Sequence, residues 1–534
     1  MASLSLVTQL NPLIQTDGLQ SSRRLYHICN ALHHLNSLRT NFESRQQMIG
    51  VQDRSFLLEQ MGEWCEDIGY HPADFDVLNA IHIAGSKGKG STASFIFSIL
   101  SEYLSDGCDP GEKRSASLRK IGLYTSPHMR SVRERIRIRE SQSTAFTDTP
   151  LDEKIFAKYS SEIWNRLNLD NRAPSQSPPF AKFLTLMGLH TFMQEKVDTA
   201  VVEVGIGGRY DSTNILRQPS VCAITSLGLE HTDLLGTRLE GIAWAKGGIM
   251  KKGVPVFTVP QDPGAMAVLE AVAVYEGADL HVVATHPDLE SIELGLQGDF
   301  QRINASLAVA VAAKHLSRMG FSGIADTATF MQSPLPEKFR RGLEKAQWPG
   351  RCETRLNHGI RWLLDGAHTI ESIEVLGPWV IKNMAAQKRA RRVLIFNQQT
   401  KDATALLHHL WQVMTSSTSR FACAEPIFHQ AIFCTNTLWE RNAALDIERV
   451  SMTYSGDSIQ DLKIQHESAT CWAEISGGES AVTVVRTVEE AIRCAAHGYG
   501  DSNCDEKDGD EAVVLITGSL HLVGSALEFL DTFA

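Results

Sequence analysis

The chain has 534 residues, of which 43% are hydrophobic and 21% charged, so it is a globular protein long enough to bury the cores of two or more domains. Lys and Arg total 51 against 62 Asp and Glu, and the net charge of −11 excludes a general nucleic-acid binder, which needs a basic surface. No apolar run approaches the ~18 residues of a membrane span, so we expect no transmembrane segment.

The start of the chain and its cysteines favour an intracellular protein. The segment Met1–Gln15 has no basic residue ahead of its apolar residues, as a secretory signal would, and the first basic residues are Arg23 and Arg24. The 10 cysteines form no C-x-x-C pair and no zinc-site spacing, which favours buried thiols. We expect a cytoplasmic protein, with the mitochondrial matrix as the alternative.

Short β-branched runs alternate with helical patterns, which is typical of an α/β protein with mostly parallel sheets. The expected strands form two series, Ala80–Ala84, Ile121–Thr125, Thr199–Val204, Cys222–Ser226 and Val254–Val259, then Arg361–Leu364, Val393–Phe396, Ile427–Phe433, Val482–Val485 and Val513–Thr517. Proline-rich breaks around residues 333–337 and 348–351 separate the two series. The sequence therefore predicts two domains, at residues 1–344 and 345–534.

A glycine-rich turn follows the first expected strand and precedes a helical pattern. Its residues are Gly85, Ser86, Lys87, Gly88, Lys89, Gly90 and Ser91. Glycines let the backbone wrap around phosphate oxygens, a helix N-terminus presents free N–H groups, and Lys89 adds a positive charge. The standard Walker pattern would need a glycine at Ile83 and a hydroxyl at Gly90, so this loop is a shorter form. The alternative is a tight turn with a solvated lysine.

Further motifs follow in order along the chain. They are Thr125-Ser126-Pro127-His128, Arg133-Glu134-Arg135, Glu203 before a glycine-rich turn, Asp211-Ser-Thr-Asn214, Glu230-His231, Trp244-Ala-Lys246, Asn304, Trp348-Pro-Gly-Arg351 and Asp365-Gly-Ala-His368. With the glycine-rich loop, this series resembles the folylpolyglutamate synthases of eukaryotic type, a branch of the Mur ligase superfamily. Their joint occurrence in this order is more specific than any single motif.

The resemblance implies an N-terminal P-loop ATPase-like domain and a smaller C-terminal Rossmann-like domain. ATP would be held by residues 85–91 with Asn304, Arg351 and Asp365. The resemblance assigns Mg²⁺ to Ser126, Glu203 and His231, with a monovalent cation as an optional further cofactor. Without the resemblance, the alternative for Glu203 is an exposed glutamate at a strand end, which is the less frequent case, whereas a histidine at position 231 is more often a satisfied structural residue than a ligand.

The candidate catalytic residues are Lys89, Lys246 and His368. Lys246 lies in an expected helix, and the sequence alone favours a solvated lysine there. The resemblance implies that this lysine is carbamylated and holds a second Mg²⁺. No carboxylate partner for a charged Lys246 is evident in the sequence, which favours the carbamate.

The segment from Arg133 to Arg139 alternates strictly and predicts a strand with four arginines on one face. Such a row could attract a polyanionic substrate, or it could protect an edge strand from aggregation. We place the substrate region at Thr125, Ser126, Pro127, His128, Arg133 and Arg135.

The implied activity is ATP-dependent addition of L-glutamate to the γ-carboxylate of a reduced folate through an acyl phosphate, in folate and one-carbon metabolism, by a monomer. A dihydrofolate synthase or a bifunctional enzyme on the same scaffold is the nearest alternative. A peptidoglycan-precursor ligase shares the fold, but the segments at 125–128 and 133–136 resemble the folate branch. A noncatalytic nucleotide-binding switch is a further alternative, against which the joint presence of Ser126, Glu203 and His231 with Lys246 argues.

Overall fold

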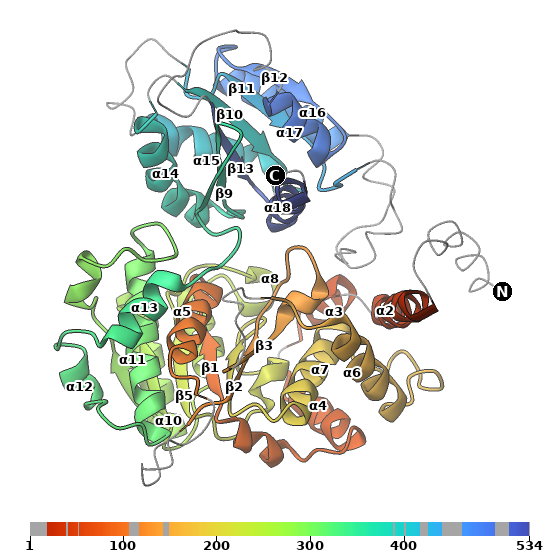
Figure 1. Ribbon diagram of the computed structural model, residues 1–534, viewed down its shortest axis with the longest axis vertical. Coiled ribbons are helices and arrows are strands. Elements are labelled where there is room, and N and C mark those ends of the chain that lie inside the picture. The colour runs from red at the N-terminus through yellow and green to blue at the C-terminus, as the bar shows by residue number, and fades with distance from the viewer. Residues whose placement is uncertain are drawn as a thin grey trace.

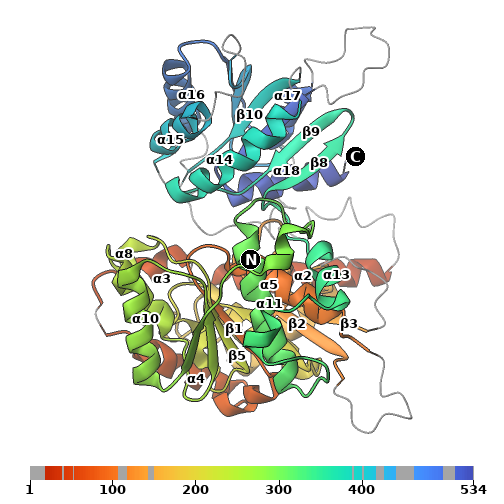
Figure 2. The same ribbon diagram turned by 90° about the vertical axis from the view of Figure 1, so that its left-hand side faces the viewer.

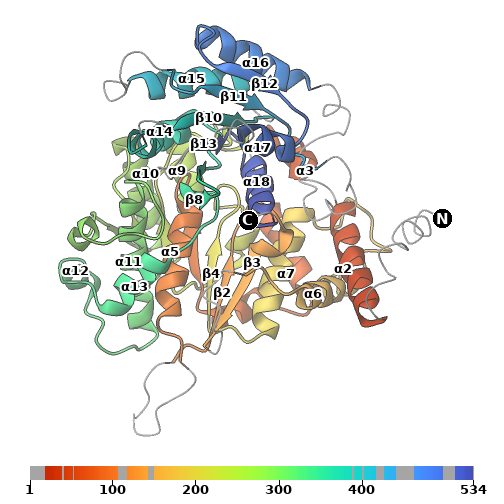
Figure 3. The same cartoon turned by 45° about the horizontal axis from the view of Figure 1, so that its top comes forward.

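The computed structural model describes residues 19–38, 41–51, 53–105, 117–141, 149–387, 390–399, 402–416, 426–439, 462–496 and 512–532. Its two β-sheets lie in separate lobes, with the C-terminal lobe stacked on the N-terminal lobe (Figures 1 and 3). Residues 1–18, on which the expected compartment depends, lie outside the described part of the chain. No helix in that described part is long and apolar enough to cross a membrane.

The N-terminal lobe is built on a seven-stranded sheet, counted over the described residues, in the order β3-β2-β4-β1-β5-β6-β7. The strands are β1 (Ile81–Ala84), β2 (Lys120–Tyr124), β3 (Ile136–Glu140), β4 (Thr199–Glu203), β5 (Val221–Ile224), β6 (Pro255–Thr258) and β7 (Asp279–Val282). Neighbouring strands are parallel except for the pair β2 and β3. The central strands are buried on both faces, as their continuous apolar runs require.

Helices cover both faces of this sheet (Figure 2). One face packs against α5 (Lys89–Ser101), α11 (Gln301–Arg318), α12 (Thr327–Phe330) and α13 (Glu337–Lys345). The other packs against α2 (Leu19–Ser37), α4 (Phe56–Asp67), α6 (Glu153–Arg166), α7 (Phe180–Gln194), α9 (Leu239–Gly247) and α10 (Pro263–Glu276). Val201 and Val202 of β4 belong to these two opposite cores, because successive side chains of a strand point to opposite faces. Two short helices, α3 (Asn41–Met48) and α8 (Thr232–Leu235), lie near the opening of the lobe.

The C-terminal lobe contains, within its described residues, a six-stranded sheet in the order β12-β11-β10-β13-β9-β8. The strands are β8 (Glu353–Asn357), β9 (Ile360–Leu364), β10 (Arg391–Phe396), β11 (Gln430–Phe433), β12 (Ala481–Val484) and β13 (Ala512–Thr517). They are parallel except for the hairpin of β8 and β9. One face packs against α14 (Ile370–Ala385), α15 (Ala403–Ser416) and α16 (Lys463–Ile475), and the other against α17 (Val488–Ala496) and α18 (Leu520–Thr532).

The observed architecture confirms the α/β class, and each strand of the two expected series overlaps a strand of the structure. The edge strands β7 and β8 were not expected from the sequence, because their exposed residues break the apolar pattern. The strand expected over residues 133–139 is wrong in its first half. Residues Val132–Arg135 form a 3-10 turn, capped by Ser131 and Glu134, and β3 begins only at Ile136.

The chain passes between the lobes near residue 350. Helix α13, Ala346 and Trp348 pack on the N-terminal core, whereas Cys352 belongs to the C-terminal core. The division at 344/345 remains a prediction.

Candidate active site

Four neighbouring strands of the N-terminal sheet, in the order β2-β4-β1-β5, deliver the predicted site residues. Ser126 follows β2, Glu203 ends β4, the glycine-rich loop follows β1, and His231 lies beyond β5. The carboxyl ends of parallel strands meet at one edge, where α/β sheets bind ligands. A cleft of about 840 Å³ opens there and is lined by residues of both lobes.

Most of the predicted site residues line this cleft. They are Ser86, Lys87, Gly88, Lys89, Gly90, Ser91, Ser126, Pro127, Arg135, Glu203, His231, Asn304, Arg351, Asp365 and His368. Five others do not line it, namely Gly85, Thr125, His128, Arg133 and Lys246. Of these five, Gly85 is the first residue of the loop itself, and Lys246 contacts it, because the Lys246 amine donates to the Gly85 carbonyl at 2.7 Å.

The glycine-rich loop is fixed to the segment that follows β5. The backbone N–H groups of Ser86 and Lys87 both donate to the Ser226 carbonyl at 3.0 Å. Gly85 has φ +143°, and a Cβ there would collide with Thr225. Two N–H groups of the loop are therefore used to fix it, and the N–H groups left for a ligand are those at the start of the following helix α5, which have no partner within the helix.

The start of α5 completes the loop. Gly88 has φ +88°, and a side chain there would clash with the Asn304 amide, which itself donates to Gln301 at 2.8 Å. Lys89 is the first residue of the helix, and its amine donates to the Gly85 carbonyl at 2.8 Å. The positive helix end and the Lys89 charge therefore face one spot, which suits a phosphate group.

Trp348, from the crossing between the lobes, packs against Gly90 so closely that a Cβ at Gly90 would lie 2.9 Å from its indole nitrogen. The Arg137 guanidinium lies over the same indole, 4.9 Å from the ring centroid. Gly90, Trp348 and Arg137 form a stack that couples the phosphate loop to the connection between the lobes.

Glu203 is 4% exposed, and its Oε2 accepts the Ser126 N–H at 3.1 Å. Burial raises the pKa of the Glu203 carboxyl, against the opposing effect of Lys89 and the Ser126 N–H. The remaining carboxylate oxygen and the Ser126 hydroxyl are oxygen donors of the kind that Mg²⁺ prefers, and His231 lines the same cleft. Among the described residues, no three His, Cys, Asp or Glu side chains are grouped as a metal site.

Lys246, on α9, forms a buried ion pair that the sequence did not reveal. Its Nζ lies 2.6 Å from Glu230 Oε1, so the expectation that Lys246 has no carboxylate partner is wrong. The pKa of Lys246 is lowered to about 8, chiefly by burial and then by the Lys89 charge, against the opposing effect of Glu230. Burial alone would raise the pKa of the Glu230 carboxyl, but Lys89 and Lys246 bring it below its ordinary value.

The C-terminal lobe contributes the turn after β9. Asp365 accepts the N–H groups of Cys352 at 2.7 Å and Ala367 at 2.8 Å, and burial raises the pKa of its carboxyl against the Arg351 charge. This carboxylate therefore holds the turn that carries His368 into the cleft. Across the cleft, Lys87 Nζ donates to Thr369 Oγ1 at 2.9 Å.

The four arginines from Arg133 to Arg139 make different contacts. Arg133 donates to the Leu151 carbonyl at 3.0 Å, and Arg139 lies over Phe97. Arg135 is buried, lines the cleft and donates to His128 Nδ1 at 3.0 Å. Burial, followed by Arg135, keeps the pKa of His128 well below its ordinary value, so the ring is neutral and accepts this bond. Of this row, Arg135 lines the cleft and Arg137 contacts its margin through Trp348.

Several cleft residues were missed by sequence reasoning, namely Arg54, Lys182, Tyr210, Asp211, Glu230 and Glu371. Asp211 and Glu230 stood inside noted motifs, so their acidic side chains near strand ends were a usable signal. The others carry no local pattern, because their place in the cleft depends on how separate helices pack.

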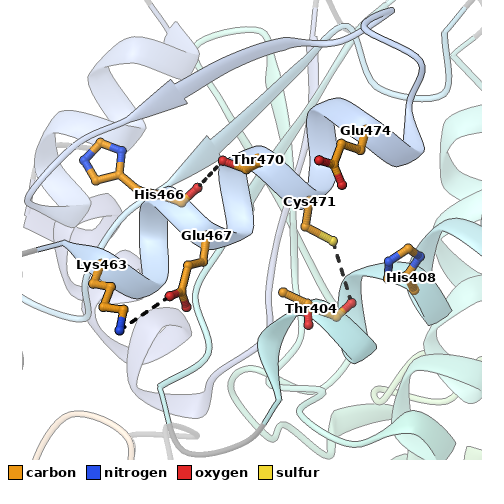
Figure 4. A pocket seen from close by; sticks show the side chains of 8 residues that line it. All are labelled: Thr404, His408, Lys463, His466, Glu467, Thr470, Cys471 and Glu474. Atoms are coloured by element: carbon orange, nitrogen blue, oxygen red, sulfur yellow. Dashed lines mark hydrogen bonds and ion pairs between the residues drawn. The ribbon is translucent and has the colours of Figure 1, made fainter.

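A second hollow, of about 500 Å³, lies on the surface of the C-terminal lobe between α15 and α16 (Figure 4). Lys463 pairs with Glu467 at 3.8 Å, and Cys471 Sγ lies 4.0 Å from the Thr404 carbonyl. None of the predicted site residues lines this hollow.

Comparison with known proteins finds relatives in sequence and in fold. No family model matches the chain. The chain is 38% identical over 515 residues to a folylpolyglutamate synthase of Saccharomyces cerevisiae, covering 94% of this chain and 86% of the yeast protein. The fold matches Mycobacterium tuberculosis folylpolyglutamate synthase complexed with ADP, with a TM-score of 0.66, 22% identity and 95% and 98% coverage of the two chains. It also matches a structure described as an FPGS–AMPPCP–folate complex, with a TM-score of 0.61, 21% identity and 94% and 99% coverage.

Proposed function

The chain belongs to the folylpolyglutamate synthase family, and on that premise we propose that it uses ATP to add L-glutamate to the γ-carboxylate of reduced folates. The observation that carries the proposal is the cleft, which brings the phosphate loop, Glu203 and Ser126 of one lobe opposite Arg351 and Asp365 of the other. A ligase needs such a site, because it must hold a nucleotide and two further substrates away from water.

The residues divide into those for ATP and those for a metal ion. The loop N–H groups, Lys89 and Arg351 bind the phosphates, and Asn304 and Asp365 complete the nucleotide site. Ser126, Glu203 and His231 hold Mg²⁺, which supplies charge neutralisation on the phosphates when bound. Lys246 is a candidate carbamate, since its lowered pKa makes the neutral amine accessible. His368 is the further catalytic candidate.

The proposed reaction has two steps. A γ-carboxylate oxygen of the folate attacks the γ-phosphorus of ATP, forming an acyl phosphate as the bond to ADP breaks. The amine of L-glutamate then attacks the acyl carbon, loses a proton, and expels inorganic phosphate to leave a γ-glutamyl amide. Lys89 and Arg351 stabilise the charge that develops on the transferred group, and the two lobes hold the reactants in line.

The folate region is the part of the cleft away from the phosphate loop. Pro127, Pro179, Ile206 and Leu235 give it apolar walls that suit an aromatic ring system, and Arg135 adds a cation for a carboxylate. Thr125, His128 and Arg133 belong to this region as supports for the segment that carries Ser126.

We also propose that the protein is a monomer in the cytoplasm or the mitochondrial matrix and that a monovalent cation is an optional activator. The proposed domain boundary lies at 344/345.

The test is mass spectrometry of the products formed with MgATP and L-glutamate, with folate and dihydropteroate offered in parallel. Folates that gain glutamate residues, with ATP hydrolysis dependent on both substrates, support the proposal. Glutamate addition to dihydropteroate alone would establish the dihydrofolate synthase alternative. ATP binding without glutamate-dependent turnover would establish a nucleotide-binding switch.

A further inference from the structure

Arg54 lies between α3 and α4 and makes three hydrogen bonds to backbone carbonyl groups. Its Nε donates to Val51, its Nη2 to Met48 and its Nη1 to Leu234, each at 3.0 Å. The first two acceptors belong to the N-terminal segment, and the third lies 180 residues further along the chain. A planar guanidinium can serve three acceptors at once, which the single ammonium of a lysine cannot do in this geometry.

The distant acceptor belongs to the turn that carries His231. Leu234 lies in α8, a single helical turn in which no residue is buried. His231 precedes this turn with φ +47°, and its carbonyl accepts the N–H groups of Leu234 and Leu235 at 2.8 Å. A helix of four residues that begins from a left-handed residue and lacks a buried side chain does not hold its shape alone.

The near acceptors belong to a wall of the cleft. Ser44 and Met48 of α3 line the cleft together with Arg54 itself. One guanidinium thus connects this wall to the His231 turn.

We propose that Arg54 is a positioning residue that fixes the His231 turn and the α3 wall in one arrangement. The inference rests on the proposed function for the task of His231 at the metal ion, but the clamp itself is a property of the free protein. Removal of Arg54 releases the His231 turn and the α3 wall from each other. The Mg²⁺ concentration needed for half-maximal turnover and the folate KM then rise together, whereas kcat at saturating substrate changes little.

The first experiment measures the clamp without any ligand. Hydrogen exchange at the amides of Leu234, Leu235 and Gly236, which donate to the carbonyls of His231 and Thr232, is compared in wild type, Arg54→Gln and Arg54→Lys. We expect exchange there to be about tenfold faster or more in both variants. The matched control is Arg166→Gln, which removes a guanidinium bond to the Ile68 carbonyl outside the cleft and leaves this exchange unchanged.

The second experiment measures the Mg²⁺ midpoint and the folate KM of the same proteins, after their unfolding temperatures confirm that they are folded. We expect both quantities to rise about fivefold or more in Arg54→Gln, with kcat at saturation within about threefold of wild type. Unchanged exchange overturns the clamp. Faster exchange with an unchanged Mg²⁺ midpoint or KM makes Arg54 a merely structural residue and also overturns the proposal. A wild type that forms no glutamylated folate contradicts the proposed function, while the exchange result still decides the clamp.

Discussion

The Lys246 amine and the Glu230 carboxylate form a buried ion pair behind the phosphate loop, with the same amine bonded to the Gly85 carbonyl. Lys246 is 1% exposed, and burial is the main reason why its pKa falls to about 8. Since CO₂ reacts only with a neutral amine, the pair is a reversible alternative to a carbamate at the same nitrogen.

The first prediction concerns this alternative. Below pH 8 the neutral fraction of Lys246 falls about tenfold per pH unit, so carbamate at fixed dissolved CO₂ should increase as pH rises from about 6 to 8. Carbon-13 NMR of the protein equilibrated with labelled CO₂ measures the amount of carbamate at each pH. Glu230→Gln removes the carboxylate that raises the pKa of Lys246, so its carbamate should form at lower pH. Lys246→Arg identifies the signal, and a wild-type spectrum identical to that of Lys246→Arg at every pH would refute carbamylation.

The second prediction concerns Lys89, whose amine donates to the Gly85 carbonyl within its own loop. Lys89→Ala should leave the fold nearly intact but lower kcat by about 10²-fold or more, because a preorganised positive group is lost from the transferred phosphate. Lys87→Ala is the control, since the Lys87 amine is engaged with Thr369 and its loss should cost less. Near-normal turnover by folded Lys89→Ala would remove the phosphate-loop assignment.

The third prediction concerns Glu203. Glu203→Gln preserves the shape and can still accept the Ser126 N–H, but it removes the charge that a cation requires. The Mg²⁺ midpoint for turnover should rise about tenfold or more, with a smaller change in folate KM. Because the pKa of the Glu203 carboxyl is raised, the wild-type Mg²⁺ midpoint should also rise as pH falls toward that pKa. Superimposable Mg²⁺ titrations of the two proteins would exclude Glu203 as a ligand.

The fourth prediction uses the close contact between Gly90 and Trp348. A methyl group at Gly90 would lie 2.9 Å from the indole nitrogen, so Gly90→Ala should lower the free energy of unfolding by about 1–3 kcal/mol. Trp348→Phe makes room for that methyl group. The double variant should therefore lose less than the sum of the two single losses in denaturant unfolding. Strict additivity would show that the two residues do not share a contact.

The fifth prediction concerns Asp531 of α18, which pairs with Arg130 of the N-terminal lobe and Arg355 of β8. These side chains are 24–43% exposed, so Asp531→Asn should cost no more than about 1 kcal/mol of unfolding free energy at low salt. The difference from wild type should shrink at high salt, because exposed ion pairs are screened. A loss that is independent of salt would indicate a packing defect in place of a lost charge pair.

Sequence reasoning succeeded where the signal is local. Buried parallel strands have continuous apolar runs, and a glycine-rich turn directly after such a run marks a phosphate loop. These two patterns located the strands of both sheets apart from the edge strands β3, β7 and β8, and the segments at the carboxyl ends of β1, β2, β4 and β5.

Sequence reasoning failed where contacts join distant segments of the chain or where one local pattern overrides another. Glu230 meets Lys246 only because α9 packs beside the segment after β5, and Arg54 reaches Leu234 across 180 residues. The alternating arginines suggested a strand, but Ser131 and Glu134 form a capping box that turns the chain before Ile136. The Ser-x-x-Glu spacing was visible in the sequence and was the better predictor.

The strand order also determines when, during synthesis, a nucleotide site can exist. Strands β1 and β2 are successive in the chain but are not neighbours in the sheet, because β4 lies between them. The glycine-rich loop and Ser126 therefore leave the ribosome long before the strand that sets their spacing, and Arg351 and Asp365 follow later still. On the proposed assignment of Arg351 and Asp365 to ATP, we expect nucleotide-dependent stabilisation only after the C-terminal lobe has been translated.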